Sequence, residues 1–440
     1  MKIMKFGGTS VGKPERMHQV ADLITRDDEP TIVVLSALSG TTNALVAIGD
    51  AMASGDKQLA KQNIDNLEAH YQKFIKELVK TDKALEKAKS IVTEHFEFLN
   101  IILKISFSEA LSKDILAQGE LLSTKLFSVY LDDIGQPHSL LPALEFMSID
   151  IYDEPQVPVI KAKLDALLKN HSDKKLFITQ GYICRNARGE VDNLKRGGSD
   201  YSASLIAAAA TATVCEIWTD IDGMHNNDPR VVKKTMPIEQ LSFEEAAELA
   251  YFGAKILHPA SIWPAQHYKV PVKLLNTMQP EAKGTLIAEQ AGSVGAKAVA
   301  AKDGIISINI KSSRMLLAYG FLRKIFEVFE KYRTPIDMVT TSEVAVSVTI
   351  DTTVHLKVIV KELEPFGKIT VEEGLTIVSV VGNEIAQTPE VLSKLFDALS
   401  VVPVHMVSYG GSKHNVSLLV PSIHKTQTLQ LLNKGMFNLD

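Results

Sequence analysis

The sequence predicts an α/β domain with a mainly parallel sheet, followed by two small α+β units. Up to about residue 290, strand patterns alternate with helical patterns, which is typical of a parallel sheet covered by helices. After residue 295 the order becomes β-α-β-β-α-β, and a similar order begins again at Leu375. The chain therefore combines one large domain with an internal repeat.

Composition narrows the class of protein. The 440 residues exceed what one hydrophobic core usually holds. The 47 basic and 52 acidic residues give a net charge of −5, which provides no strong field for nucleic acid or membranes. Cys184 and Cys215 are too few for a disulfide framework, and the apolar run at 205–218 reads as a helix followed by a strand. We expect a cytoplasmic protein with no nucleic-acid or membrane partner.

The elements of the large domain follow from local patterns. Residues 1–6 and 31–38 read as buried strands that end in turns rich in glycine or serine. Residues 57–104 are amphipathic and rich in lysine and glutamate, which indicates a helical hairpin on the flank of the domain. Further along, the patterns predict a helix at 109–130, strands at 175–183 and 215–223, and a helix at 243–256. Ser242 and Glu245 have the spacing of a capping box at the start of the last helix.

The repeat contains two similar sets of elements. The first set reads as strands at 304–311, 335–342, 344–351 and 368–374, with helices at 320–332 and 356–367. The second set reads as strands at 375–382, 402–411 and 414–420, with helices at 390–399 and 426–434. It is one strand short, and the segment 296–303 could supply that strand. We predict domains at 1–292, at 304–372, and at 296–303 plus 373–440.

Three turns of the large domain combine glycine with charged side chains between a strand and a helix. They are residues 5–10 (KFGGTS), 196–203 (RGGSDYSA) and 218–230 (WTDIDGMHNNDPR). The first is not a P-loop, because Pro14 stands where that motif requires serine or threonine. Such turns present backbone N–H groups and a helix dipole to an anion. Together they predict a ligand that carries phosphate groups.

These motifs resemble those of the aspartokinases, within the amino-acid kinase superfamily. The three turns are similar to family signatures, as are YFGAKILHP (251–259), the substrate-glutamate segment AQGELLST (117–124) and the regulatory segment IDMVTTSE (336–343). The resemblance covers essentially the whole chain. It implies the three-layer amino-acid kinase fold, with a mainly parallel sheet, followed by two ferredoxin-like ACT domains.

The resemblance also implies a reaction. The γ-phosphoryl group of ATP, with Mg²⁺, would pass to the β-carboxylate of L-aspartate, the first step of lysine, threonine and methionine biosynthesis. No fused homoserine dehydrogenase is expected. Because a carboxylate is already ionised at neutral pH, no general base is needed, and catalysis depends on positioning and charge neutralisation. No metal site formed by side chains alone is expected, since the histidines lack metal-ligand spacing.

The same resemblance assigns roles to individual residues. Lys5 would neutralise the transferring phosphoryl group, Arg196 would hold the substrate α-carboxylate, and Asp200 is the third expected catalytic residue. The aspartate pocket is expected to comprise Ser36, Thr42, Glu120, Tyr182, Arg196, Gly197 and Ser199. Glu120 and Asp200 would meet the α-ammonium or hold the residues that do. ATP is expected to contact Lys5, Gly7, Gly8, Thr219, Asp220, His225, Arg230 and Lys255.

Paired ACT domains imply an amino-acid effector and an assembly of subunits. L-lysine is the expected effector, with threonine as the alternative, and Asp337 would meet its ammonium group. The expected pocket comprises Met315, Phe321, Leu322, Asp337, Thr341 and Ser342, between the repeats of two subunits. A homodimer or a dimer of dimers, joined through the repeats, is expected.

Two other functions remain open from the sequence. One is an amino-acid kinase that acts on glutamate or a related substrate, although the QGELLST segment (118–124) and the regulatory repeats argue against it. The other is a ligand sensor without catalytic activity. The presence of Lys5, Arg196 and Asp200 together disfavours that alternative.

Overall fold

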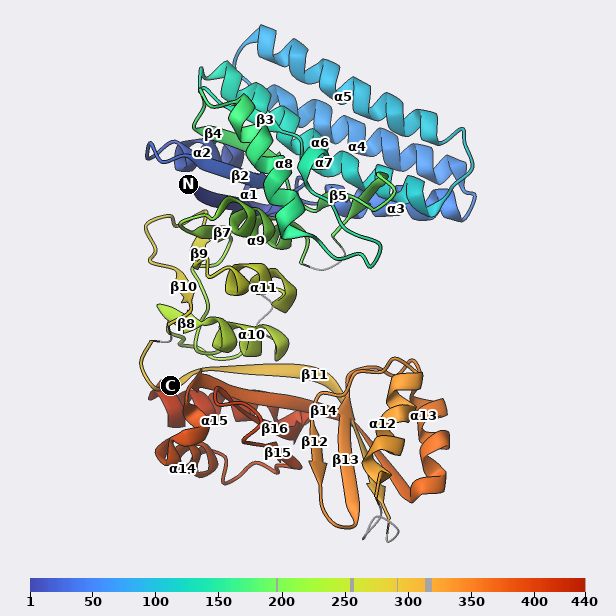
Figure 1. Cartoon of the computed structure of the whole chain (residues 1–440), viewed down its shortest axis with the longest axis vertical. Coiled ribbons are helices and arrows are strands. Elements are labelled where there is room, and N and C mark those ends of the chain that lie inside the picture. The colour runs from blue at the N-terminus through green and yellow to red at the C-terminus, as the bar shows by residue number, and fades with distance from the viewer. Residues whose placement is uncertain (195–196, 254–256, 291, 313–318, 440) are drawn as a thin grey trace. The chain divides into compact units, whose positions relative to one another are not determined.

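The chain forms two compact units. The computed structural model describes residues 1–194, 197–253, 257–290, 292–312 and 319–439 (Figure 1). The first unit comprises Met1–Met224 and Leu257–Glu289, and the second comprises His225–Ile256 and Gln290–Asp440. No helix in the described ranges combines the length and the hydropathy that a membrane span requires.

The first unit is built on a mainly parallel sheet. Its described strands are β1 (Lys2–Phe6), β2 (Thr31–Leu35), β3 (Ser139–Leu141), β4 (Leu176–Gln180), β7 (Cys215–Thr219), β9 (Val272–Asn276) and β10 (Thr285–Ala288). They lie in the order β3-β4-β2-β1-β7-β9-β10, and only β9 and β10 pair antiparallel. A separate hairpin pairs β5 (Ile183–Arg185) with β6 (Val191–Asn193). The predicted α/β class is confirmed.

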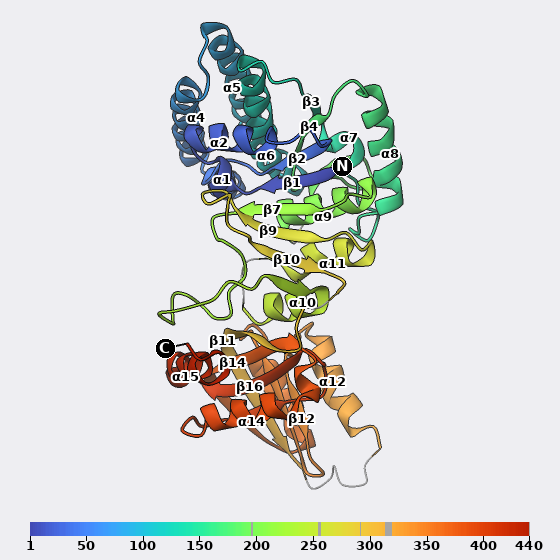
Figure 2. The same cartoon turned by 90° about the vertical axis from the view of Figure 1, so that its left-hand side faces the viewer.

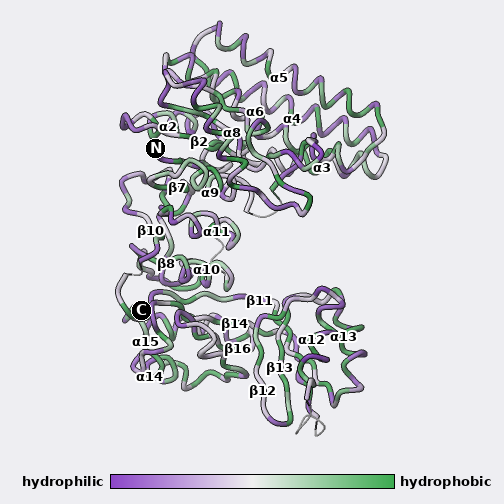
Figure 3. Tube along the Cα trace, in the orientation of Figure 1, coloured by the Kyte–Doolittle hydropathy of each residue, from purple (hydrophilic) through white to green (hydrophobic). Residues whose placement is uncertain are grey.

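Helices flank this sheet (Figure 2). They are α1 (Gly8–Val11), α2 (Pro14–Ile24), α3 (Thr41–Ala53), α4 (Lys57–Leu78), α5 (Asp82–Ile102), α6 (Glu109–Asp133), α7 (Ala143–Phe146), α8 (Val157–Asn170), α9 (Gly198–Ala210) and α11 (Pro259–His267). The predicted hairpin is α4 and α5, whose first turns are capped by the side chains of Asp56 and Thr81. Hydrophilic and hydrophobic residues alternate along both helices in Figure 3, as expected for helices with one solvated face.

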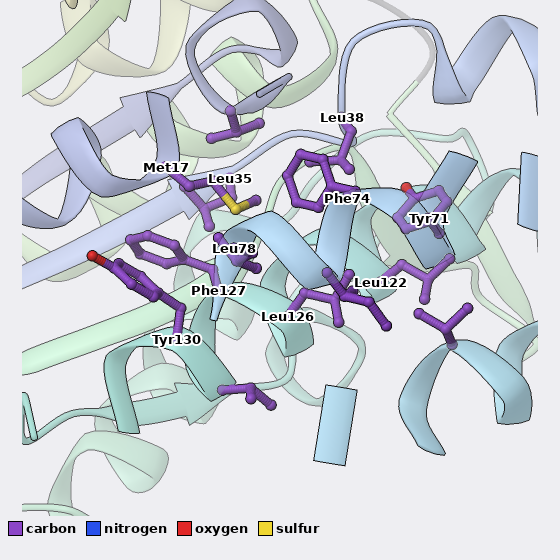
Figure 4. Packing of buried hydrophobic residues seen from close by; sticks show 14 of the residues in the cluster. Met17, Leu35, Leu38, Tyr71, Phe74, Leu78, Leu122, Leu126, Phe127 and Tyr130 are labelled. Carbon is purple, nitrogen blue, oxygen red and sulfur yellow. The ribbon is translucent and has the colours of Figure 1, made fainter. Parts of the chain in front are cut away.

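The two faces of β1 have different neighbours because successive side chains of a strand point to opposite faces. Met4 and Phe6 belong to a large apolar core shared with α2 to α6. Figure 4 shows part of this core, where Tyr71 of α4 and Phe127 of α6 are among the labelled side chains. The Lys5 side chain points to the opposite face of β1, where it pairs with Asp200 of α9. The strand therefore anchors one face in the core and presents a lysine on the other.

The second unit contains a six-stranded antiparallel sheet. Its strands follow the order β12 (Val339–Thr341), β13 (Ala345–Ile350), β11 (Gly295–Lys311), β14 (Lys368–Asn383), β16 (Asn415–Pro421) and β15 (Met406–Ser408). Its helices are α10 (Phe243–Tyr251), α12 (Phe321–Lys331), α13 (Leu356–Leu363), α14 (Pro389–Ala398) and α15 (Lys425–Phe437). Shorter elements are β8 (Gln240–Ser242) and the 3₁₀ turns η2 (Glu364–Phe366), η3 (Ile385–Gln387) and η4 (Ser422–His424). The predicted capping box of Ser242 and Glu245 is present at α10.

Two long strands join the halves of this sheet. The sequence predicts a break near residue 304 and another near residue 374, but β11 and β14 each run through without ending. Gly304 and Gly374 have φ of +77° and +73°, and the ladder between the strands shifts register near Ile305, so each strand bends instead of stopping. The predicted breaks were wrong for this reason.

Each half of the sheet has its own apolar core. One core lies beneath α12 and α13, and the other beneath α14 and α15. The segment 296–302 of β11 pairs with 377–382 of β14, next to β16. The bounds of the individual domains stay a prediction.

Candidate active site

The carboxyl ends of four adjacent strands meet at one edge of the first sheet. Strands β4, β2, β1 and β7 are parallel neighbours, so the turns that follow them lie together. In the sheet, β2 lies on one side of β1 and β7 lies on its other side, so the strand order reverses at β1. Open α/β sheets bind their ligands where the strand order reverses in this way.

A buried ion pair lies at the end of β1. Lys5 Nζ is 2.5 Å from Oδ1 of Asp200, and the two side chains are only 11% and 19% exposed. Asp200 is in the first turn of α9, where the helix dipole favours a negative charge. The two elements thus hold an ammonium group beside the first glycine turn.

Gly7 and Gly8 leave space around this lysine. A Cβ atom at Gly7 would lie 3.2 Å from Lys5 Nζ, and one at Gly8 would lie 3.1 Å from the carbonyl oxygen of Ala37. The turn is fixed from the other side, because the hydroxyls of Ser10 and Thr277 are 2.7 Å apart. Such a turn lets an anionic group approach the backbone and the lysine together.

Ser36 and Ser199 connect the turn after β2 with the start of α9. The Ser36 hydroxyl donates to Oγ of Ser199 at 2.8 Å, and Ser123 of α6 donates to the Ser36 carbonyl at 2.7 Å. A Cβ at Gly181 would lie 2.4 Å from Cβ of Ser199, so only glycine permits this approach. These contacts bring β2, β4, α6 and α9 together at one place.

Tyr182 follows in a conformation that is unusual for a side chain larger than glycine. Its φ is +65°, and its backbone N–H donates to Oγ of Ser202 at 2.7 Å. Residues held in the left-handed region concentrate at functional sites. Burial, together with the negative charge of Glu120, raises the pKa of the Tyr182 hydroxyl to about 12.

Glu120 is a buried carboxyl group on α6. Its Oε1 accepts a hydrogen bond from the backbone N–H of Ala37 at 3.3 Å. Burial raises the pKa of Glu120 to about 7. The expected pocket residue Thr42 is exposed in the first turn of α3, after Thr41, whose hydroxyl is 3.0 Å from that of Tyr71.

The expected nucleotide residues lie in both units. Thr219 and Asp220 end β7, and the Thr219 hydroxyl donates to Oδ1 of Asp220 at 3.2 Å. In the second unit, Nδ1 of His225 is 2.7 Å from Oγ1 of Thr235. The Arg230 guanidinium donates two hydrogen bonds to Asp228 there, at 2.9 and 2.8 Å, and these bonds hold the pKa of that carboxyl below its usual value. The predicted residues Arg196, Lys255 and Met315 lie outside the described residues.

The sequence did not lead us to predict several contacts of the site. Ser123, Gly181 and Ser202 hold predicted pocket residues in place. The signal for Ser123 was present, since it belongs to the AQGELLST segment. Thr277 binds the first glycine turn from 267 positions away, and no local pattern could have identified it.

Apart from Met315, the expected effector residues lie in the described part of the second unit. The Asp337 side chain is buried and accepts hydrogen bonds from the Tyr251 hydroxyl and from Lys302. Leu322, Thr341 and Ser342 are exposed. Phe321 begins α12 after Gly320, whose φ is +76°, and its ring meets that of Phe366 edge to face.

Comparison with known families identifies the class. The model of the amino acid kinase family matches residues 1–276, and the model of an ACT domain matches residues 378–436. The fold is therefore that of an amino acid kinase followed by an ACT region.

Individual relatives narrow this class. Lysine-sensitive aspartokinase 3 of Escherichia coli (strain K12) is 33% identical over 448 residues, which cover 99% of each chain. Aspartokinase 3, chloroplastic, of Arabidopsis thaliana is 35% identical over 465 residues, covering 100% of this chain and 82% of the relative. The structure of E. coli aspartokinase III in complex with aspartate and ADP (R-state) has a TM-score of 0.83 at 31% identity, covering 99% of this chain and 100% of that one. Its complex with lysine and aspartate (T-state) has a TM-score of 0.80 at 31% identity and 99% coverage of both chains. The chain belongs to the aspartokinases, which are phosphotransferases of the amino acid kinase family.

Proposed function

We propose that this aspartokinase transfers the γ-phosphoryl group of ATP to the β-carboxylate of L-aspartate. The observation that carries the proposal is the buried pair of Lys5 and Asp200 at the carboxyl end of β1, next to Gly7 and Gly8. The related E. coli enzyme binds aspartate and ADP. We infer that both substrates bind at this edge of the sheet.

Charge neutralisation would be the main catalytic contribution of the chain. The Lys5 ammonium, held by Asp200, would face the transferring phosphoryl group, and the backbone N–H groups of Gly7 and Gly8 would face its oxygens. Because these groups are already in place, they need no reorganisation when charge develops in the transition state. The acceptor carboxylate is ionised at neutral pH and needs no base.

The aspartate pocket would combine hydroxyl and charged groups. The linked hydroxyls of Ser36 and Ser199 offer hydrogen bonds to a substrate carboxylate, and the Glu120 carboxylate offers a partner for the α-ammonium. Arg196 is proposed to bind the α-carboxylate through its planar guanidinium fork. ATP would be held by Thr219 and Asp220 at the end of β7. His225, Arg230 and Lys255 would complete the nucleotide contacts.

Mg²⁺ is proposed to accompany ATP. Within the described part of the chain, no three histidine, cysteine or acidic side chains cluster in a way that would hold a metal ion. This fits Mg²⁺, which usually binds through substrate phosphates and one or two carboxylates. Asp200 and Asp220 are the carboxylates at this edge that would serve. The ion would neutralise phosphate charge.

We further infer feedback inhibition by L-lysine. The E. coli relative is lysine-sensitive and has been solved with lysine bound. Here Asp337, Thr341 and Leu322 would form part of the effector pocket, with threonine as the alternative ligand. A homodimer or dimer of dimers, joined through the ACT units, and a cytoplasmic location stay predictions.

An assay of aspartyl hydroxamate formation from ATP, aspartate and hydroxylamine tests the main proposal. We expect product with aspartate and little with glutamate, because an additional methylene displaces the reacting carboxylate. Product with glutamate but not with aspartate would overturn the proposal. Repeating the assay with lysine and with threonine identifies the effector.

A further inference from the structure

Four side chains form a charged cluster in the second unit. Oδ1 of Asp337, just before β12, accepts hydrogen bonds from the Tyr251 hydroxyl at 2.7 Å and from Lys302 Nζ at 2.6 Å. The Lys302 ammonium also lies 3.0 Å from Oδ2 of Asp351 and 4.6 Å from the centre of the Tyr251 ring. Lys302 therefore has two carboxylate partners and an aromatic face.

Asp337 has capacity for one more donor. Its side chain is 2% exposed, and among the residues that the structure describes its Oδ2 has no hydrogen-bond partner. A carboxylate oxygen buried without a partner costs free energy, and such an atom in a native fold calls for an explanation. An ammonium group of a ligand would satisfy it.

The two carboxylates around Lys302 differ in exposure. The Asp351 side chain is 40% exposed, whereas that of Asp337 is buried. A lysine placed between them can pair with either one, because its ammonium is a compact point charge on a flexible stem. A second ammonium at Asp337 would repel Lys302 and leave it paired with Asp351 alone.

Helix α10 is tied to the sheet along one side. Glu245, Glu248 and Tyr251 are spaced by three residues, so they lie on the same side of the helix. Glu245 accepts from Lys297 at 2.8 Å, and Glu248 accepts from the Asn415 side chain at 3.0 Å. Tyr251, at the end of the helix, is the contact that belongs to the charged cluster.

The strand that carries Lys302 also contacts the chain directly after α10. A Cβ atom at Gly253 would lie 2.2 Å from the carbonyl oxygen of Ala301, so the two backbones touch. A change in the position of Lys302 would therefore be felt at the end of α10. In the sequence, Lys255, which is expected to contact ATP, follows two residues later.

We propose that Lys302 competes with the ammonium group of the effector for Asp337, and that Tyr251 transmits the exchange to α10. Without effector, Lys302 pairs with Asp337 and stacks over Tyr251. With effector on Asp337, Lys302 pairs with Asp351 and leaves the Tyr251 ring, so the end of α10 loses part of its attachment. This inference rests on the proposed inhibition by L-lysine and adds the residues that couple it to the rest of the chain.

Calorimetric titration of L-lysine into the full-length protein tests the competition. In Lys302→Met the competing cation is absent, so we expect the Kd for L-lysine to fall about two- to fivefold. In Asp351→Asn the alternative partner is absent, so we expect the Kd to rise by a similar factor. A cluster that only supports the fold would weaken binding in both variants, and that result, or no change in either, would overturn the proposal.

Two controls accompany these variants. Lys302→Arg keeps the cation and should retain the wild-type Kd within about twofold. Lys394→Met removes an exposed lysine of α14 and should also leave the Kd unchanged. Thermal unfolding of each variant shows whether it is folded. If Lys302→Met does not fold, Lys302→Gln takes its place, because it also lacks the competing cation and should therefore lower the Kd, whereas a cluster that only supports the fold would raise it.

Tyr251→Leu tests the transmission step. This variant lacks the aromatic ring that Lys302 is proposed to leave when the effector binds, so we expect saturating L-lysine to leave a larger fraction of aspartokinase activity than in the wild type. The Kd for L-lysine should stay within about twofold, because Oδ2 of Asp337 is not the atom that binds Tyr251. Inhibition at saturation equal to that of the wild type would contradict the role of Tyr251.

The wild-type protein separates this proposal from the one on which it rests. If it forms aspartyl hydroxamate but binds no L-lysine, the proposed lysine inhibition is wrong and the competition falls with it. If it binds L-lysine and is inhibited, but the Kd of Lys302→Met and of Asp351→Asn changes in the same direction, only the competition is wrong.

Discussion

The two units each bury a pair of lysine and aspartate, and the two pairs differ in how their lysines are surrounded. Lys5 and Asp200 are 2.5 Å apart, and Lys302 and Asp337 are 2.6 Å apart. Lys5 leaves a regular strand and meets the first turn of a long helix. Lys302 lies where β11 shifts register, and it has a second carboxylate partner in Asp351.

This difference matches the proposed roles of the two pairs. A group that stabilises a transition state must already be in place, so a single partner on two regular elements suits Lys5. A group that responds to a ligand needs two arrangements of similar free energy, which two partners provide for Lys302. The same pair of residue types can thus serve catalysis or regulation, depending on the alternatives that surround it.

Lys5→Met is the strongest test of the catalytic pair. We expect kcat to fall by about 150- to 900-fold, because removing a preorganised charge at the reacting group costs about 3–4 kcal/mol of transition-state stabilisation. Lys13→Met removes an exposed lysine at the N-cap of α2, eight residues after Lys5, and should retain activity. If Lys5→Met keeps more than a few per cent of kcat while Lys13→Met does not, the two lysines have been assigned the wrong way round.

Asp337→Asn tests the regulatory pair in the same way. We expect the lysine concentration that gives half inhibition to rise about tenfold or more, because a hydrogen bond to a charged group contributes about 1.5–3 kcal/mol. Dose–response curves in the hydroxamate assay measure the change. Unchanged inhibition would mean that the effector ammonium binds elsewhere.

The pH dependence of KM tests Glu120. Its pKa is raised to about 7, so the carboxyl gains a proton below that pH and loses its attraction for the substrate ammonium. We expect the KM for aspartate to rise about fivefold between pH 7 and pH 6 and to lose this dependence in Glu120→Gln. A profile that is identical in the wild type and the variant would exclude Glu120 from aspartate binding.

The free energy of unfolding should also depend on the protonation of Glu120, but in the opposite direction from substrate binding. Because the pKa of Glu120 in the folded state lies above its unfolded value, its protonation contributes stability that is present at low pH and is lost as pH rises through about 7. The group therefore favours substrate binding and fold stability at opposite ends of this range. Urea unfolding of the wild type and of Glu120→Gln at pH 6 and pH 8 measures the effect.

Gly304→Ala should have the smallest effect among these variants, because it changes only the bend in β11. Nothing lies within 4 Å of a Cβ atom at this position, so the cost comes only from its φ of +77°. We expect the free energy of unfolding to fall by about 1–2 kcal/mol. Gly411→Ala is the matched control, since its surroundings are equally open and its φ is not positive. An equal loss in both variants would show that the bend does not depend on the glycine.

Much of the fold was predictable because it follows local rules. The hairpin of α4 and α5 was visible as amphipathic periodicity, and the start of α10 was visible in the capping box of Ser242 and Glu245. The continuity of β11 and β14 was not. A glycine after a strand pattern indicates a turn more often than a bend, and only pairing with the neighbouring strand keeps the chain extended through Gly304 and Gly374.

The candidate active site shows the same division. The sequence by itself predicted a ligand that carries phosphate groups, because glycine turns beside lysine and aspartate present N–H groups and charge whatever surrounds them. It also determined the parity of β1, which turns Met4 and Phe6 toward the core and Lys5 away from it.

Only the tertiary structure decided which of these residues meet. Asp200 reaches Lys5, Thr277 reaches Ser10, and Asp337 reaches Lys302 across long stretches of chain. The tertiary structure also raises the pKa of Glu120, which requires that water be excluded by residues distant in the sequence. Local sequence sets the conformation of a segment and the chemistry it carries, whereas burial and the choice of partner depend on the packing of the whole unit.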